Sequence, residues 1–150
     1  MQKYEIRDLS LAPSGHQKIE WVKNNMPLLS GLEKEFLETK PFEGIKISLS
    51  VHLEAKTAYL CKVLAAGGAQ MSVTGSNVLS TQDDIAAALV EDGLMVFAYH
   101  GATPEEYDRH IEMTLEHKPN IIIDDGGDLV GMIHKSRPDL GEEVWGGCEE

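Results

Sequence analysis

The sequence has few cysteines and no long apolar run. Its two cysteines, Cys61 and Cys148, have neither the density of a disulfide scaffold nor the spacing of metal ligands, which favours a reducing compartment. Free cysteines are usually buried, so we interpret Cys61 as a core residue. The apolar runs fall far short of the roughly 18 to 20 residues that span a membrane, and the first residues lack the apolar stretch of a secretory signal. We therefore expect a cytoplasmic protein without a membrane partner.

Positive charge is also scarce. The 150 residues include 13 Lys and Arg against 25 Asp and Glu, which gives a formal net charge of −12. Such a balance repels phosphate backbones, and the densest basic stretch, 135–137, is short, so nucleic acid is not an expected partner. The length fits one domain, and 42% hydrophobic with 25% charged residues is typical of a packed globular chain.

Short apolar runs alternate with amphipathic segments of helix length over most of the chain. This pattern is typical of βαβ units around a parallel sheet. Strands are predicted at 45–51, 70–74, 94–99, 120–123 and 143–145. The first 40 residues predict two helices, the second beginning at Pro27. The predicted fold class is α/β: an open, mostly parallel sheet with flanking helices, Rossmann-like or flavodoxin-like, preceded by two N-terminal helices.

Capping pairs predict where three helices begin. In such a pair a hydroxyl serves one unpaired backbone N–H, and a side chain three positions later serves another. The pairs are Ser14 with Gln17, Ser80 with Asp83, and Thr103 with Glu106. The histidines at 16, 110 and 117 lie in charge-rich helical segments, so we interpret His16, His110 and His117 as surface residues.

Polar residues follow each predicted strand. Ligands of open parallel sheets bind beyond the carboxyl ends of the strands, so these residues should share one rim. They are His52, Glu54 and Lys56 after the first strand, Asn77 and 80–84 after the second, His100 after the third, and 124–128 after the fourth.

The run Asp-Asp-Gly-Gly-Asp at 124–128 is the most specific local feature. Glycines let the backbone bend beside a ligand, and clustered carboxylates raise the pKa of at least one member, which suits proton transfer. The alternative is a solvated loop in which Asp128 caps the next helix. His52 has the same two interpretations, a proton shuttle or an ordinary histidine at a sheet edge.

Several common catalytic and cofactor motifs are missing from the sequence. No Gly-x-Gly-x-x-Gly follows a strand, and there is no P-loop, no Gly-x-Ser-x-Gly and no credible Cys-His pair. These absences leave two functional classes open. One is an enzyme that uses the acidic rim, and the other is a free-standing flavodoxin-like module that binds a ligand or signals without catalysis.

Five motifs together resemble the S-adenosyl-L-homocysteine hydrolase family. They are Asp-Leu-Ser-Leu-Ala at 8–12, Met-Pro at 26–27, Ser-Thr-Gln-Asp at 80–83, Asp-Asp-Gly-Gly-Asp at 124–128 and Glu-Glu at 149–150. The stretch 52–57, His-Leu-Glu-Ala-Lys-Thr, is similar to the archaeal and thermophilic-bacterial branch.

The resemblance implies a thioether hydrolase of the methyl cycle in which residues 1–150 are the N-terminal substrate-binding domain. The chain would then be truncated before an NAD-binding domain. The implied reaction cleaves S-adenosyl- or S-inosyl-L-homocysteine to the nucleoside and L-homocysteine by 3′-oxidation, elimination, water addition and re-reduction. It further implies NAD as cofactor and a homotetramer or dimer, and we expect residues 1–150 alone to be inactive.

Site roles carry over from the family to matching positions. Asp125 matches the catalytic aspartate near C4′ and C5′, Glu150 a glutamate that contacts the ribose hydroxyls, and His52 a histidine beside the leaving group. The implied substrate-binding set adds Glu54, Lys56, Asn77, Thr81 and Gln82, with Ser80 in the same loop. Gln82 also matches a glutamine that helps to hold a monovalent cation in some members. No NAD-binding residue is expected within 1–150; those contacts should begin just after Glu150.

One departure concerns the purine. Many family members have Thr and Glu where this chain has Glu54 and Lys56. Adenine offers an N6 amine donor, whereas hypoxanthine offers an O6 acceptor and an N1–H donor. Glu54 can accept from N6 or N1, but an ammonium favours O6. We therefore hypothesise that S-inosylhomocysteine competes with, or replaces, S-adenosylhomocysteine.

Overall fold

A single parallel sheet organises the chain. The computed structural model describes residues 3–150, and within them six strands pair in the order β1-β4-β3-β2-β5-β6, every pair parallel. The strands are β1 Tyr4–Ile6, β2 Lys46–Val51, β3 Gln70–Gly75, β4 Met95–Ala98, β5 Ile121–Asp124 and β6 Gly146–Glu149. The predicted α/β class with an open parallel sheet is confirmed.

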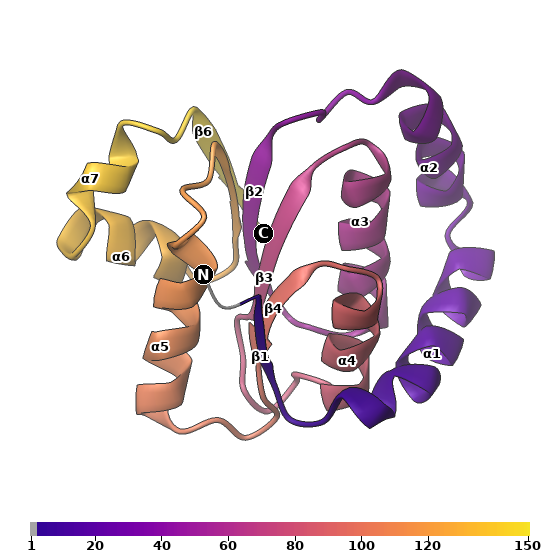
Figure 1. Cartoon of the computed structure of the whole chain (residues 1–150), viewed down its shortest axis with the longest axis horizontal. Coiled ribbons are helices and arrows are strands. Elements are labelled where there is room, and N and C mark those ends of the chain that lie inside the picture. Colours follow the sequence, from indigo (N-terminus) through magenta and orange to yellow (C-terminus); the bar gives the residue numbers. More distant parts are fainter. Residues whose placement is uncertain (1–2) are drawn as a thin grey trace.

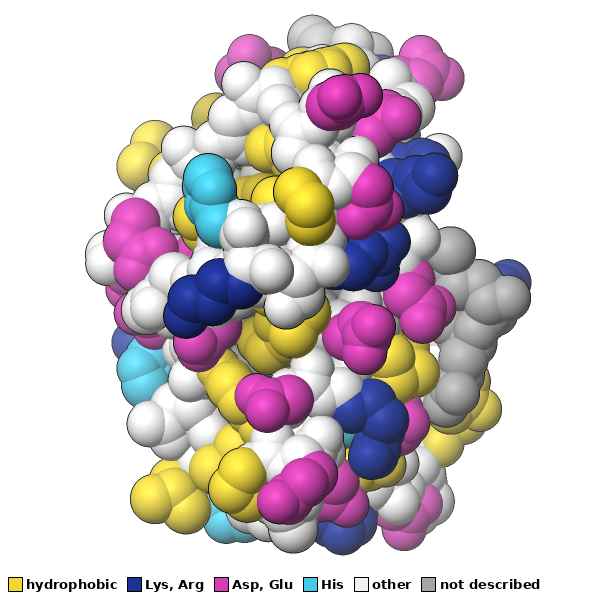
Figure 2. All heavy atoms as spheres, turned by 90° about the vertical axis from the view of Figure 1, so that its left-hand side faces the viewer, with side chains coloured by type: hydrophobic (Ala, Val, Ile, Leu, Met, Phe, Trp, Pro, Cys, Tyr) yellow, Lys and Arg dark blue, Asp and Glu magenta, His cyan; other side chains and the backbone are white. Residues whose placement is uncertain are grey.

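Helices cover both faces of the sheet (Figure 1). One side carries α1 Ala12–Asn25, α2 Pro27–Thr39, α3 Ala55–Ala66 and α4 Asp83–Glu91; the other carries α5 Pro104–Leu115, α6 Asp128–Lys135 and the short α7 Pro138–Gly141. No helix within residues 3–150 is long and apolar enough to cross a membrane. On the α5–α7 side, acidic side chains are scattered among basic, apolar and polar ones (Figure 2).

The core is built by strands that are buried on both faces. Leu49 of β2 and Val73 of β3 are fully buried, and they belong to a cluster that includes the inner faces of α1, α3 and α4. A smaller cluster centred on Ile122 and Leu115 lies under α5–α7. Cys61 is buried in the larger cluster, as predicted, and burial raises the pKa of its thiol to about 12.

Two strands differ from the prediction. The two N-terminal helices are preceded by β1, which pairs with Val96–Ala98 of β4 at the sheet edge. Three residues are too few to show the alternation by which a strand is read from sequence. The last strand lies at Gly146–Glu149 rather than 143–145. Its two glycines have low strand propensity, so only backbone pairing with β5 reveals it.

One capping pair is confirmed and two are wrong. Thr103 and Glu106 form the expected reciprocal box at α5. Ser14 lies inside α1, which begins at Ala12, and its hydroxyl donates to Asp84 Oδ2 at 2.7 Å. The helix after β3 begins at Asp83 without a side-chain cap, and Ser80 contacts His52 instead.

The surface assignment of His110 and His117 is also wrong, since both are almost fully buried. His110, Thr114 and His117 recur at helical spacing and form one inward stripe beside the apolar residues of α5. His110 Nε2 lies 3.3 Å from Glu5 Oε1, and His117 Nε2 lies 2.8 Å from Ser48 Oγ. The charged residues on the opposite face of α5 masked this stripe in the sequence.

Candidate active site

A large cavity lies at the carboxyl ends of β2 and β3, where the sheet reverses its strand order. From β2 the chain proceeds to β3 and β4 on one side, and then crosses back to β5 on the other. Open α/β sheets bind ligands at such a switch point. The cavity has a volume of about 1000 Å³. That volume lies at the upper end of the range for small-molecule sites, about 300 to 1,000 Å³.

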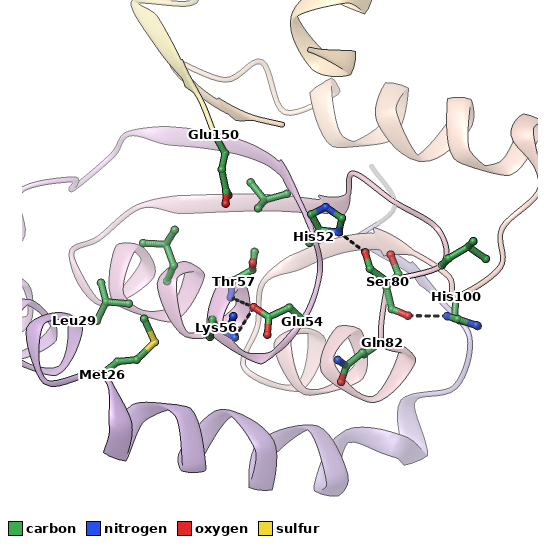
Figure 3. A pocket seen from close by; sticks show the side chains of 14 residues that line it. Met26, Leu29, His52, Glu54, Lys56, Thr57, Ser80, Gln82, His100 and Glu150 are labelled. Atoms are coloured by element: carbon green, nitrogen blue, oxygen red, sulfur yellow. Dashed lines mark hydrogen bonds between the residues drawn. The ribbon is translucent and has the colours of Figure 1, made fainter. Parts of the chain in front are cut away.

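Most of the predicted site residues line this cavity (Figure 3). They are His52, Glu54, Lys56, Ser80, Thr81, Gln82 and Glu150. Asp125 does not line it, but it lies beside His52. Asn77 lines a separate cavity of about 420 Å³, and its Oδ1 accepts from the backbone N–H groups of Leu79 and Ser80. Asn77 therefore shapes the loop that carries Ser80 and Thr81.

His52 connects β2 to the acidic loop after β5. Its Nδ1 lies 2.5 Å from Ser80 Oγ, and its Nε2 lies 3.6 Å from Asp125 Oδ2. Asp125 Oδ2 also accepts a hydrogen bond from Ser76 Oγ at 2.9 Å. The imidazole is half exposed and therefore accessible to a ligand. An imidazole and a carboxylate at this separation can exchange protons with a bound molecule.

The three aspartates of the acidic loop have different environments. Asp124 is buried, and its carboxylate accepts from the N–H groups of Asp125 and Val130. Burial raises the pKa of Asp124, and the nearby charges of Glu149 and Asp128 add to the rise. The expected raised pKa is therefore present, although its main cause is burial rather than repulsion. Asp128 was the alternative candidate to cap the next helix. Asp124 instead accepts from the Val130 N–H in the first turn of α6.

Asp128 instead fixes the helix that follows the loop. It is the first residue of α6, and its Oδ2 accepts from the Tyr107 hydroxyl at 2.6 Å. The same hydroxyl lies 3.2 Å from the Ser76 carbonyl oxygen. Burial, followed by the contact with Asp128, raises the pKa of Tyr107, so this phenol stays protonated. Of the three aspartates, Asp125 is the one whose carboxylate faces His52.

Glu54 caps a helix as well as lining the cavity. Its Oε1 accepts from the N–H groups of Lys56 and Thr57, at 3.0 and 3.1 Å, and so caps α3. The second carboxylate oxygen is left for a ligand. Lys56 lines the main cavity and a neighbouring one beside Trp21.

Glu150 reaches the cavity through the last strand. Its backbone N–H donates to the Asp124 carbonyl oxygen at 2.9 Å, which continues the pairing of β6 with β5. Its side chain points toward the cavity from above β2 in Figure 3. Glu149 supports the acidic loop from the same strand, because its Oε1 accepts from the Gly126 N–H.

Sequence reasoning missed the apolar wall of the cavity. Met26, Leu29 and Leu60 line it from the α1–α2 junction, α2 and α3, and Leu79, 74% exposed, lies at its rim. Apolar residues on helices cannot be told from core residues by pattern alone. The Met-Pro motif at 26–27 marked this region without assigning it a role. His100, expected at the rim, also lines the cavity.

The resemblance implies two bound groups, NAD and a monovalent cation. For NAD, no Gly-x-Gly-x-x-Gly loop follows any strand, so residues 1–150 do not form a dinucleotide site of that kind. For a cation, no group of three or more His, Cys, Asp or Glu side chains within residues 3–150 could hold a metal ion. Gln82 Oε1 already accepts from the Lys18 ammonium at 2.9 Å.

Comparison with known proteins gives a consistent result. Residues 3–145 match the family model described as S-adenosyl-L-homocysteine hydrolase. The chain is similar to S-inosyl-L-homocysteine hydrolase of Methanococcus maripaludis (52% identity over 97% of this chain) and adenosylhomocysteinase of Pyrococcus abyssi (49% over 98%). It is 48% identical over 99% of its length to adenosylhomocysteinase of Gloeothece citriformis. In each case the match covers 35% of the relative, so the chain spans about a third of their length.

Proposed function

The chain belongs to the S-adenosyl-L-homocysteine hydrolase family, and from this premise we propose that it forms the substrate-binding domain of such a hydrolase. The reaction proposed is reversible cleavage of a nucleosyl-L-homocysteine to the nucleoside and L-homocysteine. The observation that carries the proposal is the position of His52 Nε2, 3.6 Å from Asp125 Oδ2, beside a cavity of about 1000 Å³ at the switch point of the sheet. Glu150 enters the same cavity from β6.

The roles proposed for these side chains are those of the family positions that they match. Asp125, near C4′ and C5′, takes the C4′ proton during elimination and returns it when water adds, and Glu150 binds the ribose hydroxyls. His52 gives a proton to the departing homocysteine thiolate and later takes one from the water that adds at C5′. Ser80 holds the other ring nitrogen of His52 at 2.5 Å and so fixes the direction of Nε2.

NAD is the proposed cofactor, and its contacts are proposed to lie outside residues 1–150. When bound, it supplies the hydride acceptor for the ribose 3′-hydroxyl. A small-molecule substrate, a cytoplasmic location and a homotetramer or dimer complete the proposal. Support for these points comes from family membership and, for the substrate, from the dimensions of the cavity.

The purine proposed for the substrate is hypoxanthine, in competition with adenine. Glu54 uses one carboxylate oxygen to cap α3, and Lys56 lines the same cavity. A lysine ammonium only donates hydrogen bonds, so contact with the purine would favour the O6 acceptor of hypoxanthine. The names of the relatives do not decide the point, because S-inosyl and adenosyl hydrolases match the chain at 52% and 49% identity.

A crystal structure of the protein in its natural full length, soaked with inosine and separately with adenosine, tests the site. We expect the ribose within hydrogen-bond distance of Asp125 and Glu150, and the purine against Lys56. Binding of the nucleoside in the smaller cavity beside Asn77, or no binding at all, would overturn the proposal.

A further inference from the structure

Lys18 of α1 reaches the wall of the cavity that we assign to the nucleoside. Its ammonium donates to Gln82 Oε1 at 2.9 Å and pairs with Asp84 Oδ2 at 2.7 Å. Gln82 precedes α4 and lines the main cavity, whereas Lys18 lines the neighbouring cavity beside Trp21. The ammonium therefore contacts a residue of the main cavity, although Lys18 is not among the residues that line that cavity.

Close packing of two helices holds this ammonium in place. A Cβ atom built on Gly15 of α1 would lie 2.0 Å from the Asp84 carbonyl oxygen, so only glycine permits this approach of α1 to α4. Ser14 donates to the same Asp84 oxygen at 2.7 Å. Although burial acts to raise the pKa of Asp84, the hydrogen bonds from Lys18 and Ser14 keep it below its ordinary value. The carboxylate therefore stays ionised and anchors Lys18.

The contact also fixes the orientation of the Gln82 amide. A lysine ammonium can only donate, so the amide oxygen must face it. The amide NH₂ of Gln82 is then the group left to donate to a ligand. A mobile alkali ion at the same oxygen would meet a like charge within a few ångströms, which disfavours its binding.

We propose that the Lys18 ammonium takes the place of a monovalent cation at Gln82, so that ligand binding in this cavity is independent of alkali ions. Lys18 is a positioning residue, since it acts through Gln82. This inference rests on the proposed function for the identity of the ligand, but its ion dependence can be measured without any ligand.

The test uses the protein in its natural full length at constant ionic strength, in potassium chloride and in choline chloride. The melting temperature is measured without ligand, and inosine and adenosine affinities are measured by calorimetry. The variants are K18M, which removes the ammonium, K18R, which keeps a positive charge, and K34M as control. Lys34 is an exposed lysine of α2 and lies outside both cavities.

For the wild type, K18R and K34M, we expect each protein to have the same melting temperature and the same nucleoside affinities in the two salts. In K18M the Gln82 and Asp84 oxygens become available to potassium, which should raise its melting temperature by about 2 to 4 °C relative to choline. Nucleoside affinity of K18M should fall about tenfold in choline and recover in potassium. A wild type whose melting temperature is higher in potassium than in choline would overturn the inference. So would a folded K18M whose melting temperature is the same in the two salts. Absence of nucleoside binding with the predicted melting shifts would instead overturn only the proposed function.

Discussion

His52 Nε2 and Asp125 Oδ2 lie 3.6 Å apart across the switch point of the sheet. This separation is longer than a hydrogen bond. His52 is anchored by Ser80, and Asp125 by Ser76, so neither side chain uses the other as its main partner. The gap leaves room for both groups to contact one ligand atom or one water molecule. Catalytic contacts of this kind often tighten only when the substrate binds.

Asp125→Asn should reduce turnover by about 10² to 10⁴-fold while the protein stays folded. The amide keeps the shape of the side chain but cannot accept a proton, and Asp125 is only partly buried. Steady-state kinetics and the melting temperature of the natural full-length protein check this prediction. Asp139→Asn, at an exposed residue paired with Arg137 on α7, is the matched control. Near-normal turnover of the Asp125 variant would exclude the assigned role.

Stability should fall as the pH drops from about 6.5 toward 4 because of His117. Burial first, and then the charge of Lys46, lowers the pKa of His117 to about 4. Between that value and the ordinary histidine pKa, the unfolded chain binds a proton that the folded chain does not. The free energy of unfolding then decreases by at most about 1.4 kcal/mol for each pH unit lost.

The structure adds a reason why His117 resists protonation. The Ser48 hydroxyl donates to the Thr114 carbonyl oxygen at 2.7 Å, so His117 Nε2 must carry the hydrogen shared with Ser48. The Nδ1 atom is buried and has no hydrogen-bond partner that could stabilise a second proton. Urea unfolding at several pH values gives the slope of the unfolding free energy against pH. This slope should be smaller for His117→Gln than for the wild type. His134→Gln, at an exposed site, should retain the wild-type slope. An unchanged slope in His117→Gln would contradict this explanation.

The double variant Glu54→Thr and Lys56→Glu should shift the purine preference toward adenosine. Threonine can still cap α3, and glutamate in the first helical turn is favourable, so the fold should tolerate both changes. The lost ammonium removes a donor to O6, and the new carboxylate can accept from N6. We expect the ratio of kcat/KM for S-inosyl- to S-adenosylhomocysteine to fall by about tenfold or more. A ratio equal to that of the wild type would show that these residues do not contact the purine.

The 150-residue chain by itself should not hydrolyse either substrate when NAD is added. No dinucleotide fingerprint occurs in its sequence, and it spans only 35% of the length of its relatives. Liquid chromatography of the nucleoside product provides the measurement. Turnover above the rate of a no-protein blank would show that residues 1–150 bind the hydride acceptor themselves.

The sheet was predictable because short runs rich in Ile, Leu and Val, as at 45–51 and 120–123, alternate with segments of helix length. The rim residues were predictable for the same reason, since His52 and Asp125 follow those two runs. Two kinds of feature were not. The strands at the sheet edges are short, and β6 begins with two glycines, so their pairing depends on the tertiary structure.

Contacts between distant segments were the second kind. Ser14 contacts Asp84, and Lys18 contacts Gln82, across 70 and 64 positions. Local patterns assigned Ser14 to a helix cap and gave Lys18 no role. The packing of α1 on α4, which Gly15 permits, decides both. The buried stripe of His110 and His117 was hidden because a charged opposite face dominates the composition of α5.

The most direct test of the central claim is hydrolysis of S-inosyl- and S-adenosyl-L-homocysteine by the natural full-length protein supplied with NAD. The account predicts release of homocysteine from at least one of the two, with S-inosylhomocysteine used comparably well or better, and loss of that activity in Asp125→Asn. A folded protein that releases homocysteine from neither substrate would contradict the assignment of this cavity to a nucleosyl-homocysteine hydrolase. A large preference for S-adenosylhomocysteine would agree with the assignment as a hydrolase but would contradict the proposed role of Lys56.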